Sequence, residues 1–351
     1  MPSLEPAIVP DAAWSPMAFL TGPGSSSPLD AEMTSSTPTT TPNSAAAAST
    51  ASIPGERPRG RSYAATTARW GYLMIAPLVI GFAIFFLVAL GWSFVLSFTR
   101  WTLPNSPEWI GIQNYRDVWH DAAFRTALRN TFAIAVPLII LRLVLALLLA
   151  VALNSKIRFR NFYRLVFFLP VLTMPVAIGR IWKWLFDPGF GPINAFLRQV
   201  GLPQPDWLLY PGSATIAVII VLLWSSVGYD MIIYLSGLQA IPKDYYDAAA
   251  VDGANGWRSF RDITVPLLSP TIFFLSVIGV IGSLQVFDLV YVMTRVDTTN
   301  RLPTVVYYIY DTGFADRQMG YATALAWVLL VIILIFTLIQ FRLQRRWVHY
   351  A

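Results

Sequence analysis

The sequence of 351 residues contains no cysteine and only two histidines, His120 and His349. The absence of cysteine excludes disulfide bonds, thiolate metal sites and a cysteine nucleophile. Two histidines are too few for a metal centre built from several imidazoles. Lysine occurs three times and never follows glycine, so the chain lacks the G-x-x-x-x-G-K-[ST] loop that cradles nucleotide phosphates.

Charged residues are also scarce, at 13%, whereas hydrophobic residues make up 56% of the chain. Soluble domains carry roughly 25% charged residues. A soluble core could not bury this much apolar surface, so the composition predicts a membrane protein. The net charge of +6 is not gathered into a compact basic block, so no nucleic-acid partner is expected.

Residues 1–60 differ from the rest because they are rich in Ser, Thr, Pro and Ala and show no apolar periodicity. Such a segment cannot bury enough surface to offset the entropy of ordering it, so we expect a disordered cytoplasmic tail. It lacks the basic start and compact apolar stretch of a signal peptide, so we expect it to be retained. Residues 61–351 are then expected to form the membrane domain.

Six apolar runs in that domain are long enough to cross a bilayer, which takes roughly 20 helical residues each. The sequence therefore predicts an all-α polytopic protein with six transmembrane helices, both termini lying on the same side. Arginine and lysine are more frequent in the segments on that side, which predicts that it is cytoplasmic. Arg125 and Arg129 in an outer loop weaken the contrast. The six runs cover about 71–97, 132–153, 163–186, 214–237, 267–293 and 320–341.

A polar helical hairpin at 238–266 separates the fourth and fifth runs, on the side predicted to be cytoplasmic. Asp247 lies early in its first helix, where the helix dipole favours negative charge, and Ala248 and Ala249 offer a small helical surface. Gly253 permits a turn that a side chain would resist. An ordinary cytoplasmic hairpin without a partner is the plainer alternative.

The order Asp247-Ala248-Ala249, Gly253, Ile263 and Pro266 resembles the EAA loop of ABC importer permeases, written E-A-A-x3-G-x9-I-x-L-P. Asp247 stands where that loop usually has Glu, and Val265 where it has Leu. The resemblance implies that these six residues form a coupling helix and its base, which take up force from a partner ATPase.

Two other blocks are similar to carbohydrate-importing permeases, a subgroup that includes the maltose and glycerol-3-phosphate permeases. The resemblance covers about 70–350 and implies a non-catalytic subunit of a bacterial plasma membrane importer. Its implied partners are a second permease subunit, a homodimeric ABC ATPase that binds ATP and Mg, and an extracytoplasmic sugar-binding protein or lipoprotein. No cofactor is expected on this chain. The matching positions are Gly111, Asn114, Tyr115, Phe124, Asn130, Thr131, Pro170, Trp184, Phe186, Gly191 and Asn194.

Polar residues inside the runs are candidates for the substrate pathway, because such residues usually face a bundle interior or a wet cavity. Sugar sites combine planar hydrogen-bonding groups with aromatic rings. Pairing between helices, of Arg142 with Asp230 or Asp288, is the alternative. The predicted pathway residues are Trp224, Tyr229, Ser283, Gln285, Phe287 and Asp288.

A di- or oligosaccharide is the favoured substrate, and a glycerol-phosphate-type solute remains open. A self-sufficient ion-driven transporter is a further alternative, which would use membrane carboxylates and inverted repeats. An intramembrane enzyme would need a nucleophile–base or metal grouping, and the sequence contains no recognisable one.

Overall fold

The computed structural model describes residues 61–155, 157–295 and 302–348, with the backbone alone over 61–67. The predicted tail over 1–60 lies outside the described residues. The chain divides into two units, 1–67 and 68–351, and the second contains the fold described below.

Four helices of the described part are long and apolar enough to cross a membrane, and the number reaches six if each of two bent pairs is one span. The first long helix joins α1 (Arg61–Phe82), a π-helical turn (Ala83–Val88) and α2 (Ala89–Leu96). The others are α4 (Ala122–Asn154), α8 (Pro211–Ala240) and α15 (Met319–Gln344). The prediction of an all-α polytopic protein is confirmed.

The second span begins ten residues before the expected start at 132, because Asp121 caps α4. The Asp121 carboxylate accepts hydrogen bonds from the backbone N–H groups of Ala123 (2.7 Å) and Phe124 (3.2 Å). These bonds satisfy donors that have no partner inside the helix.

The third span, expected as one run over 163–186, is broken. α5 (Arg160–Phe168) and the 3-10 turn η2 (Leu169–Leu172) meet α6 (Pro175–Leu185) at a bend of 100°. Pro175 has no N–H to continue the helix and holds Met174 in an extended conformation.

The fifth span is also divided. The short helices α10 (Gly256–Ser259) and α11 (Val265–Leu267), joined by the π-helical turn η3 (Phe260–Thr264), meet α12 at 64°. α12 (Ser269–Leu284) ends nine residues before the expected limit of 293, and α13 (Asp288–Thr294) follows after an interruption at 285–287. Phe287 leaves the helical region there, with φ −136° and ψ −62°.

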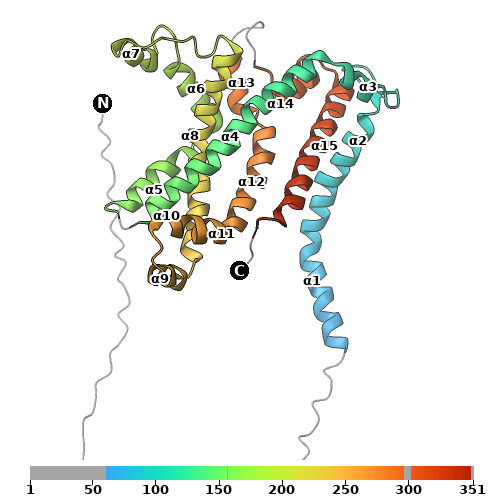
Figure 1. Cartoon of the computed structure of the whole chain (residues 1–351). Coiled ribbons are helices and arrows are strands. Elements are labelled where there is room, and N and C mark those ends of the chain that lie inside the picture. Colours follow the sequence, from blue (N-terminus) through green and yellow to red (C-terminus); the bar gives the residue numbers. More distant parts are fainter. Residues whose placement is uncertain (1–60, 156, 296–301, 349–351) are drawn as a thin grey trace, which may run out of the picture. The chain divides into compact units, whose positions relative to one another are not determined.

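Shorter elements cover the ends of the spans (Figure 1). One end carries the antiparallel strands β1 (Thr99–Arg100) and β2 (Glu108–Trp109), and we name it the outer end, following the predicted orientation. The opposite, inner end carries α9 (Lys243–Val251). The remaining outer elements are α3 (Gln113–His120), α7 (Pro192–Gln199), α14 (Val305–Tyr310) and the π-helical turn η4 (Asp311–Ala315).

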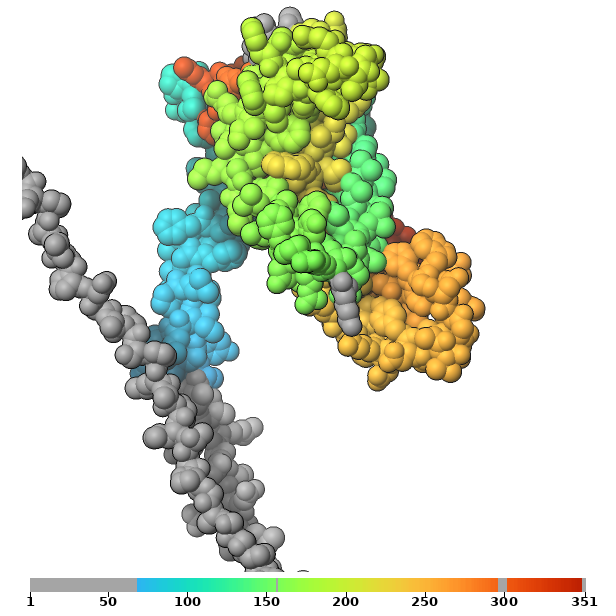
Figure 2. Space-filling view, turned by 90° about the vertical axis from the view of Figure 1, so that its left-hand side faces the viewer, coloured from blue at the N-terminus to red at the C-terminus, as the bar shows by residue number. Residues whose placement is uncertain are grey.

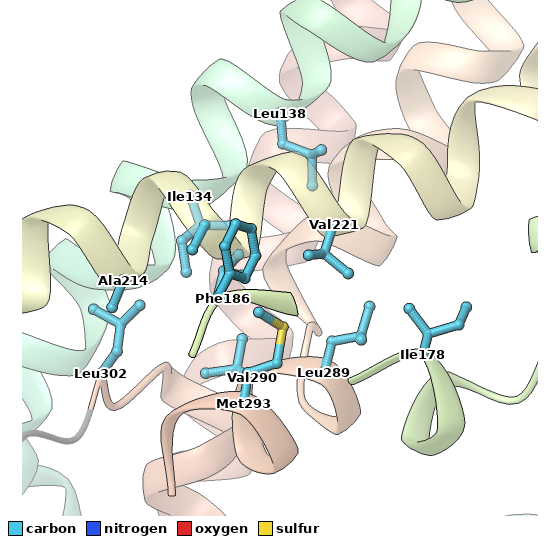
Figure 3. Close-up of a cluster of buried hydrophobic side chains, with 12 residues drawn as sticks. Ile134, Leu138, Ile178, Phe186, Ala214, Val221, Leu289, Val290, Met293 and Leu302 are labelled. Atoms are coloured by element: carbon cyan, nitrogen blue, oxygen red, sulfur yellow. The ribbon is translucent and has the colours of Figure 1, made fainter. Parts of the chain in front are cut away.

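The core lies where α4 and α8 pack along each other, with α6 and α13 closing one side of it. Figure 3 shows Ile134 and Leu138 of α4 facing Val221 of α8, and Leu289 and Met293 of α13 beside them. Nearer the inner end, small residues such as Ala146 and Ala150 let the two helices approach closely.

Close approach is most stringent at Gly228 of α8. A Cβ at this position would lie 2.0 Å from the carbonyl oxygen of Phe167, so no larger residue fits without moving α5. In contrast, the apolar window of the first span buries none of its residues inside the unit. Its α2 end contacts α15, where Phe94 packs edge-on against Trp327 at 4.8 Å.

Candidate functional site

The inner hairpin is built around a helix end that needs glycine. α9 follows α8 after Ile241 and Pro242, and it ends where Gly253 adopts a φ of +75°. The N–H of Ala254 donates to the carbonyl of Ala249 (2.9 Å), and that of Gly253 donates to Ala250 (3.1 Å). This pattern closes a helix around a left-handed residue, which accounts for the glycine of the motif.

A hydrogen bond between side chains joins the return half of the hairpin to its first half. The hydroxyls of Tyr246 in α9 and Thr264 in η3 lie 3.0 Å apart. Asn255 caps α10 by accepting from the N–H of Arg258 (2.8 Å). The hairpin is therefore a braced unit that joins α8 directly to the bent fifth span.

The predicted coupling residues divide between the tip of the hairpin and its base. Asp247 and Ala248 are exposed and Ala249 is half-buried, whereas Ile263 and Pro266 are half-buried at the base. Figure 2 shows the orange hairpin standing out from the green helices at the inner end. Its surface also exposes large apolar side chains, including Val251 at 88% and Trp257 at 70%. Exposed apolar patches are typical of surfaces that contact another protein or a membrane.

An ion pair lies inside the membrane unit. The Arg142 guanidinium of α4 donates to both carboxylate oxygens of Asp230 in α8, with Nη2 2.6 Å from Oδ1. The Asp230 side chain is 0% exposed. The predicted pairing of Arg142 with Asp230 is confirmed, and the alternative partner Asp288 is exposed instead. A bidentate pair satisfies both charges at this largely buried position.

A hollow of about 220 Å³ adjoins this pair. Non-helical backbone at membrane depth is tolerated where it lines a cavity, and the break between η2 and α6 borders this one. Tyr229, the predicted pathway residue, is one of its walls. The lining residues are Arg142, Pro170, Val171, Thr173, Pro175, Ile178, Ser225, Ser226, Tyr229 and Leu289.

The other predicted pathway residues do not surround the same hollow. Trp224 packs edge-on against Trp182 at 5.5 Å. The Ser283 hydroxyl is buried and donates to the carbonyl of Gly279 (2.6 Å), which is a local helical bond. Gln285 lines a separate, largely apolar hollow of about 470 Å³ beside α14 and α15. Phe287 and Asp288 lie at the adjacent break, where Asp288 is exposed.

Several of the matched positions outside the hairpin hold the outer end together. Asn114 is buried and donates to the carbonyls of Ser97 (2.8 Å) and Thr99 (2.9 Å). The hydroxyl of Thr131 accepts from the N–H of Val305 (2.9 Å). Asn194 accepts from the indole N–H of Trp207 (2.9 Å). These residues position the connections between spans, and none of the three lines the Tyr229 hollow.

A polar cluster at Asp121 was not predicted from the sequence. Besides capping α4, its carboxylate accepts from the hydroxyls of Tyr308 (2.6 Å) and Tyr321 (2.8 Å). Burial acts to raise the pKa of Asp121, but the hydrogen bonds from the two tyrosines and the two N–H groups outweigh it and lower that pKa. Local sequence can indicate only the cap, because the two tyrosines lie 187 and 200 residues further along the chain.

Comparisons with known proteins agree with this arrangement. Residues 142–349 match the family described as binding-protein-dependent transport system inner membrane component. The chain is 38% identical over 285 residues to the probable ABC transporter permease protein YesP of Bacillus subtilis (strain 168), covering 80% of this chain and 92% of that protein. It is 34% identical over 276 residues to the arabinooligosaccharides transport system permease protein AraP of the same organism, covering 78% and 88%.

A solved structure extends the likeness to three dimensions. A chain in the crystal structure of a bacterial alginate ABC transporter, in complex with an alginate pentasaccharide-bound periplasmic protein, superposes with a TM-score of 0.72. The two sequences are 25% identical, and the match covers 82% of this chain and 98% of the other. The protein is therefore a multi-pass membrane protein that belongs to the family of binding-protein-dependent transport system inner membrane components.

Proposed function

We propose that the chain is a permease subunit of an ATP-binding cassette importer, and that it translocates a neutral di- or oligosaccharide. Family membership supports the transport role. The names of the arabinooligosaccharide permease and of the alginate transporter with its pentasaccharide-bound periplasmic protein support a saccharide and a binding protein that delivers it.

The exposed hairpin is the observation that carries this proposal. A small helix whose tip presents Asp247 and Ala248 beside apolar surface can seat in a groove of an ATPase. Because α9 continues from α8 and Tyr246 contacts Thr264, a push on the tip is passed to the fourth and fifth spans together. The hollow beside Tyr229 lies between elements that such a movement displaces.

The remaining components follow from this role. A second, different permease subunit completes the pore, and a homodimeric ATPase binds ATP and Mg and hydrolyses the nucleotide. This chain is non-catalytic and places the hairpin and both termini in the cytoplasm. The binding protein docks at the opposite, outer end.

The ion pair favours a neutral solute over a glycerol-phosphate. Of the described residues that line the Tyr229 hollow, Arg142 alone carries a cationic group. Asp230 occupies that guanidinium on both of its carboxylate oxygens, so little net positive charge faces the hollow. The negative charge of a phosphate ester would therefore remain uncompensated there.

Co-purification tests the proposal. Ala248→Trp adds bulk to an exposed position, so the chain should fold, but the tagged chain should recover less than a tenth of the ATPase that the wild type recovers. Ala195→Trp, at an exposed alanine of α7 on the outer end, is the matched control and should retain the ATPase. Equal recovery of the ATPase with both variants would contradict binding of the ATPase at the hairpin.

Uptake into proteoliposomes separates this function from ion-driven transport. The full complex should accumulate saccharide only with ATP and loaded binding protein. Uptake by the purified chain alone, driven by a proton or sodium gradient, would favour the secondary transporter instead.

A further inference from the structure

A row of aromatic rings runs along α13, α14 and η4 at the outer end. The Phe314 ring lies 5.2 Å from that of Tyr310, and Tyr310 lies 5.2 Å from Phe287 and 5.3 Å from Tyr291. Rings at these separations stack or meet edge to face. The row thus connects two segments on either side of the connection between α13 and α14.

The row offers a surface and is not merely part of the core. Phe314 is 66% exposed, and Tyr310, Tyr291 and Phe287 are half-buried. Tyr307 is buried behind them, with its ring 5.5 Å from Tyr291. The rings are therefore supported from one side and accessible from the other.

Polar groups flank the end of the row at Phe287 and Tyr291. Gln285 and Asp288 are both exposed and stand on either side of Phe287 in sequence, at the break between α12 and α13. The Arg295 guanidinium lies over the Tyr291 ring, 4.7 Å from its centroid. An amide, a carboxylate and a guanidinium beside aromatic faces can bind a ligand that has both C–H faces and hydroxyl groups.

Saccharides have that combination, whereas a lipid tail lacks the hydroxyl groups that would bond to Gln285 and Asp288. We infer that Phe314, Tyr310, Phe287 and Tyr291 form an aromatic track that receives the sugar rings of the substrate at the outer end and guides them towards Gln285 and Asp288. This inference rests on the proposed function, since it names the surface that a transported saccharide touches first on this chain.

Leucine substitution tests the track, because leucine keeps an apolar side chain and removes the ring. The complete complex is reconstituted with its binding protein in proteoliposomes and assayed with labelled arabinotriose, xylotriose and maltotriose, and the trisaccharide that the wild type imports is then used. Phe314→Leu should lower the amount of sugar imported per ATP hydrolysed by about fivefold, as the loss of a stacking contact implies. Phe314→Trp should restore it, and Tyr310→Leu should lower it similarly.

Trp119→Leu is the matched control, because Trp119 is an 81% exposed ring of α3 outside the row, and it should import at the wild-type ratio. Unchanged import by both Phe314→Leu and Tyr310→Leu would overturn the track. So would an equal fall in uptake and ATP turnover, or poorer recovery of the second permease subunit, since each points to a packing role. If the wild-type complex imports none of the three sugars, the saccharide assignment itself fails, which is a different result from normal import by the variants.

Discussion

At the outer end, the spans are held by side-chain hydrogen bonds between segments far apart in sequence, whereas the inner hairpin is held mostly by bonds within itself. Asp121 binds tyrosines 187 and 200 residues away, and Thr131 binds the backbone of Val305. The hairpin has a glycine turn, the Asn255 cap and a hydrogen bond between Tyr246 and Thr264. The outer end is thus held together by contacts between distant segments of the chain, while the inner hairpin exposes polar and apolar groups.

The largest loss of stability is expected from Asp121→Ala. Four hydrogen bonds to one partly exposed carboxylate disappear, which should lower the free energy of unfolding by about 2–3 kcal/mol. Thermal unfolding of the purified complex measures this as a lower Tm. Asp117→Ala is the control, since that exposed carboxylate accepts one bond from Gln113. Equal Tm values for the two variants would show that the outer end is not held at Asp121.

Thr131→Val should have the next largest effect. The substitution keeps the shape of a buried side chain but removes the acceptor for the Val305 N–H, at about 1–2 kcal/mol. Thr126→Val, where the exposed hydroxyl donates to the Ala122 carbonyl of its own helix, should change the Tm little. If both substitutions change the Tm equally, the hydrogen bond between Thr131 and Val305 adds no stability beyond that of a local helical bond.

Acid should weaken the same outer end by a smaller amount. Because the folded pKa of Asp121 is lowered, its stabilising contribution is fully present above roughly pH 4, the ordinary aspartate range, and is lost as pH falls through the folded pKa. The Tm difference between wild type and Asp121→Asn should therefore be constant from pH 7 to 5 and shrink below pH 4. A difference that does not change with pH would assign the effect to shape and not to charge.

Tyr246→Phe examines the inner end. Loss of the hydroxyl contact with Thr264 should lower stability by about 0.5–1 kcal/mol, because the contact is partly buried and neutral. Transport should fall more than stability, since the brace between α9 and η3 is the link to the fifth span. Tyr245→Phe, on the neighbouring exposed tyrosine, is the matched control for both measurements.

Asp247→Ala should have the smallest effect on stability and the clearest effect on transport. The side chain is exposed, so the unfolding free energy should change by less than about 0.5 kcal/mol. Saccharide uptake by the full complex should nevertheless fall several-fold. A large drop in Tm, or unaltered uptake, would remove the contrast between an outer end that stabilises and an inner end that couples.

Hydropathy located the four long helices because long buried or lipid-facing helices have a composition that a sequence displays directly. It did not predict the 100° break near Pro175 or the interruption at 285–287. Proline signals where a helix can stop, but the direction of the next segment depends on what it packs against, and α6 packs on α13 from a distant part of the chain.

The candidate site divides in the same way. The hairpin was predictable because alanine propensity, the glycine turn and the proline are all local features. The hollow beside Tyr229 was predictable only in part, since Thr173 and Leu289 reach it from two breaks whose positions the sequence did not reveal. Ser283 is buried and its hydroxyl donates within its own helix, a placement that hydropathy alone does not predict.

Neither half of the bent third crossing is long enough to traverse the bilayer alone. At helical rises, residues 160–172 measure roughly 21 Å and residues 175–185 roughly 16 Å, against ~30 Å of hydrocarbon. The break between them lies at membrane depth, where irregular backbone is tolerated only if protein or a cavity surrounds it. The third crossing can therefore span the bilayer only with both halves present and packed on α8, which makes its integration a joint property of neighbouring segments.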